Sequence, residues 1–203
     1  EEAVIKLVAK TFGALPQRAE MPTKFKSDRP VIFRKDKTPL VFTHAGEANQ
    51  ALAQVYWPVT DVEPDIEPQT SRVVGVTAAI MRLKVVDEVR ETLGATYSPT
   101  AGASLSTVHP GFGYVNAGAE VKPEDVDRVI AALEKIAAHM RAGEITDDEF
   151  SRAVTPSLEA LPQNATSNGY WLNLISQAQT RPDVLLRSTI PAVEASLRAV
   201  TKA

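Results

Sequence analysis

The chain has 203 residues, enough for one large domain, or a domain with an attached fragment, and for a substantial core. Its formal net charge is −3 and it has no basic run, so nothing favours a nucleic-acid partner. The absence of cysteine excludes disulfide bonds and thiolate metal sites, and fits either an oxidising or a reducing compartment. No apolar run approaches the length of a membrane span, so we expect no membrane partner either.

The first 30 residues are predicted to stand apart from the rest. Residues 2–12 have the apolar spacing of a short helix, which Gly13 would end. Residues 17–30 are rich in proline, lysine and other polar residues, a composition typical of a linker. We therefore expect a domain boundary there, with residues 31–203 forming one domain. The chain begins within a helical pattern, which suggests a fragment of a longer protein.

Three β-type runs precede residue 61. Residues 31–33 and 40–42 flank a charged segment and could form the two arms of a hairpin. Residues 50–59 predict a further strand that is fairly apolar on both faces. Such a strand is expected in the middle of a sheet, covered on each side.

Residues 68–93 predict a long helix. Its apolar face has the three-and-four spacing of Ile80, Leu83, Val86 and Leu93. Arg90 projects from that same face, because it lies four residues after Val86 and seven after Leu83. Gly94 fits the position that commonly ends a helix, and Tyr97 follows at once in a β-rich run. An arginine on an apolar face needs a partner, because an unpaired buried charge is costly.

The second half of the chain predicts a hairpin and then helices. Residues 95–107 and 112–121 should pair as antiparallel strands, joined by a turn, with the long helix packed across one face. A helix is expected from Pro123 until Gly143. Thr146 and Glu149 form a capping box that opens the next helix, which Pro156 should kink or interrupt. Two more helical stretches are expected at residues 168–179 and 184–201.

This order of elements predicts an α+β fold. We expect an antiparallel β-sheet with a long helix and several C-terminal helices packed on one face.

The segment Arg90-Glu-x-Leu-Gly-x-x-Tyr97 resembles the arginine–tyrosine signature in the non-catalytic part of pitrilysin/insulysin-type zinc metallopeptidases. The resemblance implies that Arg90 and Tyr97 point into the cleft and bind substrate near the scissile bond. It extends to His44-Ala-Gly46, to Gln50 and to Asn168-Gly-Tyr-Trp-Leu172. The last segment is similar to the long bacterial single-chain members, so this piece would be the final domain of a clamshell of four related domains.

The resemblance also carries expectations about neighbours and compartment. Phe12-Gly-Ala-Leu-Pro16 resembles the last helix of the preceding domain in this family, which assigns residues 1–16 to that domain. The partners would be the N-terminal catalytic domains of the same polypeptide and a peptide substrate. Long bacterial members are often exported, which implies a periplasmic location.

Metal chemistry is missing from this chain. Catalytic family members carry His-x-x-Glu-His on a helix, where two histidines bind zinc and the glutamate activates water. The three histidines of this chain are scattered, and His44-Ala-Gly-Glu47-Ala48 looks like a broken version with alanine at the second ligand. We therefore expect no metal and no cofactor in this chain, which should be inactive alone. By resemblance, zinc would belong to the catalytic domain of the parent enzyme.

Two alternatives stay open. Arg90 could simply be a last-turn cation favoured by the helix dipole, with its stem packed and its head in water. The parent could also be a metal-free, non-peptidase relative that acts as a peptide-binding or structural scaffold. An intact zinc motif upstream of this chain would favour the enzyme, and its absence the scaffold.

Overall fold

The computed structural model of the chain describes residues 1–17, 31–60, 68–93, 99–109, 111–179 and 181–202. The chain divides into two compact units, Glu1–Pro30 and Val31–Ala203. The first unit contains the predicted short helix, α1 (Glu2–Lys10), followed by one turn of 3-10 helix. Whether this unit is the end of a preceding domain stays a prediction.

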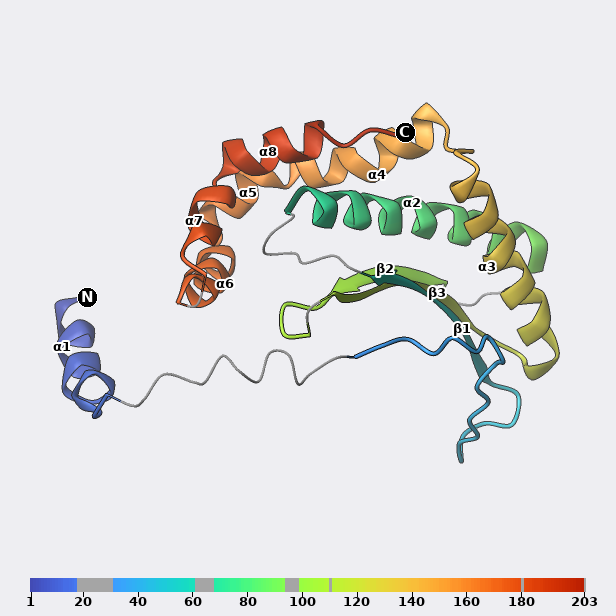
Figure 1. The fold of residues 1–203 in the computed structure, drawn as a ribbon, viewed down its shortest axis with the longest axis horizontal. Helices are drawn as coiled ribbons and strands as arrows, with labels where there is room; N and C mark the ends of the chain where they lie inside the picture. The colour runs from blue at the N-terminus through green and yellow to red at the C-terminus, as the bar shows by residue number, and fades with distance from the viewer. Residues whose placement is uncertain (18–30, 61–67, 94–98, 110, 180, 203) are drawn as a thin grey trace. The chain divides into compact units, whose positions relative to one another are not determined.

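The second unit is built on an antiparallel sheet. Among the described residues its strands are β1 (Ala51–Thr60), β2 (Thr100–Leu105) and β3 (Phe112–Val121), in the order β1-β3-β2 (Figure 1). Ala117 of β3 lies between Val55 of β1 and Ala101 of β2 in the register. The predicted hairpin of β2 and β3 is therefore confirmed, although its first strand is shorter than expected, and residues 95–98 lie outside the described part.

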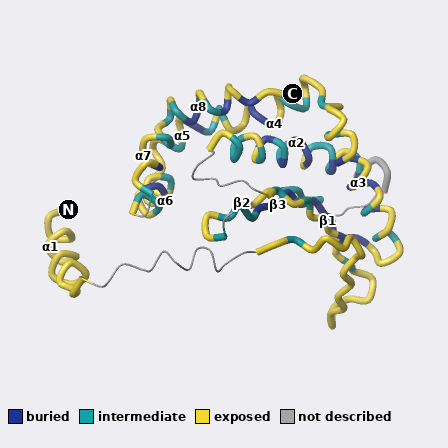
Figure 2. Tube along the Cα trace, viewed as in Figure 1, coloured by how far each residue is buried: buried dark blue, intermediate teal, exposed yellow. Residues whose placement is uncertain are grey.

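Two helices cover one face of this sheet. The long helix α2 (Pro68–Leu93) packs on β2, and α3 (Val126–Arg141) packs on β1 and β3. Figure 2 shows buried positions concentrated where these helices meet the sheet. The fully buried side chains of this layer include Val85, Val89, Val121, Val129 and Leu133. Alanines on β3 are small enough to let the helices approach the strand closely.

Five helices follow at the C-terminal end of the unit, within the part that the structure describes, and two of them lie over α2. The five helices are α4 (Asp147–Glu159), α5 (Leu161–Thr166), α6 (Asn168–Ala178), α7 (Asp183–Arg187) and α8 (Ile190–Arg198). Both α4 and α8 contact α2, on its side away from the sheet (Figure 1). The second unit is thus the predicted α+β fold, with its helices on one face of an antiparallel sheet.

Two expectations about strands are wrong. The described residues 31–49 contain no strand, so segments 31–33 and 40–42 do not form a hairpin. Phe33 instead stacks on Phe112, with ring centroids 4.8 Å apart. β1 is also an edge strand of the described sheet, and its second face is open, because Leu52 is 62% and Tyr56 48% exposed. The apolar residues on both faces of β1 wrongly predicted a central strand, because exposed apolar side chains are common on protein surfaces.

The expected helix boundaries need several corrections. α4 continues through Pro156 to Glu159 without interruption, since its buried face against α2 outweighs one lost backbone hydrogen bond. The stretch 184–201 is two helices, because Pro191 has no N–H to bond the carbonyl of Arg187. The bounds of α2 agree with expectation, and Gly143 follows α3 with φ 78°. α1 ends at Lys10, short of the expected residue 12, and α3 begins at Val126 after a 3-10 turn at Pro123.

Candidate functional site

The predicted substrate-binding residues lie at the C-terminal end of α2. Arg90 belongs to the last turn of this helix, which packs on β2 through its second half. Val85 and Val89, one turn apart, are fully buried against the sheet. The side chain of Arg90 and the whole of Tyr97 lie outside the described residues. Their convergence on one point therefore stays a prediction.

One ion pair connects α2 to α4. Lys84 Nζ lies 2.6 Å from Glu149 Oε1, and both side chains are largely shielded from solvent. Glu149 also completes the capping box of α4, where its carboxylate accepts from the backbone N–H of Thr146 at 2.8 Å. Burial raises the pKa of Glu149, but hydrogen bonds from Lys84 and Thr146 outweigh this and lower it below its ordinary value. The carboxylate is therefore charged at neutral pH and holds the two helices together.

A second, weaker ion pair connects α2 to α3. Lys135 Nζ lies 3.4 Å from Glu88 Oε1, with the lysine side chain more than half exposed. The α2 members of the two ion pairs, Lys84 and Glu88, are four residues apart, and their partners belong to α4 and α3 respectively. The second half of α2, which ends in the turn with Arg90, is thus tied to both α3 and α4 as well as to the sheet.

The histidines remain separate. His44 is exposed and leans against Gly46, while His139 Nδ1 lies 3.3 Å from Glu144 Oε2 near the end of α3. Among the residues that the structure describes, no group of three His, Cys, Asp or Glu side chains could hold a metal ion. His44-Ala-Gly-Glu47-Ala48 lies in an irregular segment rather than on a helix, so it lacks the geometry of the helical zinc motif.

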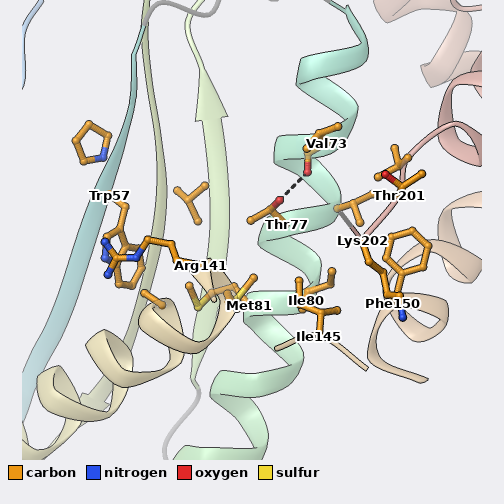
Figure 3. A pocket seen from close by; sticks show the side chains of 16 residues that line it. Trp57, Val73, Thr77, Ile80, Met81, Arg141, Ile145, Phe150, Thr201 and Lys202 are labelled. Atoms are coloured by element: carbon orange, nitrogen blue, oxygen red, sulfur yellow. Dashed lines mark hydrogen bonds between the residues drawn. The ribbon is translucent and has the colours of Figure 1, made fainter. Parts of the chain in front are cut away.

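The structure also contains a pocket that sequence reasoning missed (Figure 3). It lies between α2, α3, the start of α4 and the C-terminal segment, with a volume of about 520 Å³. Residues of β1, β3 and each of these helices line the pocket, and together they span more than 140 positions of the sequence. No local pattern could have revealed it, because only tertiary packing brings these positions together.

The walls of the pocket are mostly apolar. Its lining includes Val76, Ile80, Met81, Met140, Ile145 and Phe150. Its polar groups lie on opposite sides in Figure 3, with Trp57 and Arg141 on one side and Thr201 and Lys202 on the other. The Nε1 atom of Trp57 is buried and has no hydrogen-bond partner in the described part of the chain.

Comparison with known proteins assigns the fold to a family. Residues 1–156 match the family described as the Peptidase M16 inactive domain, and the chain belongs to this family. The resemblance to pitrilysin/insulysin-type peptidases is thereby confirmed. No curated protein matches the chain.

Two solved structures show the same fold at low identity. A conserved protein from Enterococcus faecalis V583 has a TM-score of 0.58 and 19% identity, over 77% of this chain and 35% of that one. The periplasmic protease PqqL from Escherichia coli has a TM-score of 0.60 and 13% identity, over 97% of this chain and 22% of that one. The chain therefore spans well under half of each of these proteins. No helix among its described residues is long and apolar enough to cross a membrane.

Proposed function

We propose that this chain is the C-terminal, non-catalytic substrate-binding domain of a pitrilysin/insulysin-like zinc metalloendopeptidase. The match to the inactive domain of the M16 peptidases carries the proposal. In this reading, residues 1–16 end a preceding domain, residues 17–30 link it to residues 31–203, and catalytic domains of the same polypeptide hold the zinc. A periplasmic location is supported by the similarity to the periplasmic protease PqqL.

Within this proposal, Arg90 and Tyr97 act on a peptide bound at another domain's zinc. Peptide hydrolysis passes through a tetrahedral intermediate, in which the former carbonyl oxygen gains negative charge. A guanidinium or phenol hydroxyl aimed at that oxygen stabilises the transition state more than the ground state. The site would thus be completed across the chamber, and this chain alone would hydrolyse nothing.

The test uses the complete parent polypeptide with Arg90→Ala and Tyr97→Phe. We expect each variant to lower peptide turnover by about tenfold or more, since one lost oxyanion donor costs about a hundredfold to a thousandfold and an exposed residue less. Unfolding temperature and zinc content should not change. Kinetics and unfolding are measured on the same preparations.

Two matched variants control for the loss of an arginine charge and of a tyrosine hydroxyl elsewhere in the domain. Arg82→Ala removes an exposed arginine from the same helix, and Tyr56→Phe removes a hydroxyl that donates to Gln54 on the same strand. Both should leave turnover unchanged. A loss of stability with normal turnover in the Arg90 and Tyr97 variants would leave them only a structural role. A parent without an intact zinc motif would instead favour the non-peptidase scaffold.

A further inference from the structure

We propose that the pocket between α2, α3 and α4 binds an amphipathic monocarboxylate, with an alkyl body among the helices and its carboxylate at Arg141. Its volume of about 520 Å³ is within the range of ~300–1,000 Å³ of small-molecule sites. This proposal uses neither Arg90 nor Tyr97, so it does not depend on the role proposed for them.

The lining suits an unbranched apolar body. The lining includes Val76, Ile80 and Met81 of α2 and Met140 of α3. Phe150 of α4 lies on the same side of the pocket as Lys202 (Figure 3). Methionine side chains are flexible and polarizable, so they can adapt to an alkyl chain. Contact with these walls would remove both the ligand and the lining from water.

The charges select the head group. The described residues that line the pocket include two cations, Arg141 and Lys202, and no carboxylate. Lys202 already pairs with Asp147 outside the pocket. Arg141 forms no ion pair within the described part of the chain, so its guanidinium remains available to an anion. A carboxylate can accept two parallel hydrogen bonds from a guanidinium, which an alcohol cannot match.

The indole of Trp57 supports the same orientation. Its buried Nε1 lacks a hydrogen-bond partner among the described residues, and a buried donor without an acceptor is costly. Trp57 and Arg141 lie on the same side of the pocket in Figure 3. An acceptor oxygen bound at this side would relieve the unsatisfied donor and neutralise the cation together.

Trp57 also provides the measurement. The chain has two tryptophans, and Trp171, on α6, does not line the pocket. The 203-residue chain with Trp171→Phe therefore reports on Trp57 alone. Titration with decanoate should give a saturable change in its fluorescence with one ligand per chain. Decanol and decyltrimethylammonium, which share the alkyl body, should bind about tenfold to a hundredfold more weakly, because they lack the charge-assisted bonds to Arg141.

Substitutions at exposed lining residues test the location. Arg141→Gln should reduce decanoate affinity to that of decanol, and Arg141→Glu should reverse the preference toward decyltrimethylammonium. Val73→Phe should block all three ligands, since Val73 lines the pocket from α2 and is 41% exposed, so the larger ring can be placed without disturbing the core. Arg82→Gln, an equal charge change outside the pocket, should alter nothing.

Four results would overturn the proposal. They are no saturable change, equal affinity for decanoate and decanol, several ligands per chain, or binding that survives both Arg141→Gln and Val73→Phe. Circular dichroism of each variant establishes that the fold is intact. Because both positions are exposed, at least one of these variants should remain folded and decide the question.

Discussion

Lys84 and Glu149 join two helices that are remote in sequence, and the same glutamate caps the second of them. Lys84 Nζ lies 2.6 Å from the Oε1 atom of Glu149, while its Oε2 atom accepts from the backbone of Thr146. The side chains are 17% and 20% exposed, so neither charge is well solvated. One carboxylate therefore contributes both to the N-terminal cap of α4 and to its attachment to α2.

Loss of the lysine charge should destabilise the chain. Lys84→Met leaves the Glu149 carboxylate shielded and without its cation, which should reduce the free energy of unfolding by about 1–3 kcal/mol. Lys135→Met breaks the more exposed pair with Glu88 and should cost at most about 1 kcal/mol. Urea unfolding of the 203-residue chain measures both. An equal cost for the two variants would mean that burial adds nothing to the Lys84 pair.

Acid should weaken the same contact. The folded-state pKa of Glu149 lies below its ordinary value of 4.5, so the unfolded chain binds a proton more readily. This contribution to stability is therefore fully present above the ordinary value and is lost as the pH falls through the lower, folded-state pKa.

Glu149→Gln tests that linkage without removing the capping box, which glutamine also completes. The variant should be less stable than the wild type at neutral pH, and the difference should shrink below pH 4.5. Asp147→Asn is the control, because Asp147 has a lowered pKa beside Lys202 but is fully exposed, so its pH dependence should be weaker. Unfolding curves across this pH range give the comparison. A constant difference at all pH values would contradict the linkage.

Two glycines should respond in opposite ways to alanine. A Cβ at Gly118 of β3 would lie 2.5 Å from the carbonyl oxygen of Ala53, so Gly118→Ala should separate β3 from β1 and cost about 1–3 kcal/mol. Gly75, inside α2, has open space at that position. Gly75→Ala should stabilise the chain by about 0.5–1 kcal/mol, because alanine favours a helix interior. Thermal unfolding shows both signs, and destabilisation by Gly75→Ala would contradict the packing described for α2.

The core layer between α2, α3 and the sheet should dominate stability. Leu133 of α3 is fully buried, so Leu133→Ala should cost about 2–5 kcal/mol through lost burial and the remaining cavity. Leu172 of α6 is 71% exposed, and Leu172→Ala should change stability by no more than about 0.5 kcal/mol. Chemical denaturation of both variants checks the contrast. Similar losses would mean that α6 packs more closely than its exposure indicates.

The sequence alone determined the elements whose signals are local. Apolar periodicity and end residues predicted α2 and α3, the Thr146–Glu149 spacing predicted the capping box of α4, and the two strands of the hairpin were recognised. The Arg90-to-Tyr97 signature indicated the family that the comparison confirmed. These predictions succeeded because each one depends on residues that are only a few positions apart in the sequence.

Only the tertiary structure decided which apolar runs become strands and where distant side chains meet. Residues 31–33 have strand-like composition, but a strand needs a partner along its backbone, and Phe33 packs its ring on Phe112 instead. Lys84 forms an ion pair with Glu149, which is 65 positions away in the sequence, and Trp57 lines the same pocket as Arg141 and Lys202. Burial and long-range pairing are properties of the packed chain, and no stretch of sequence contains them.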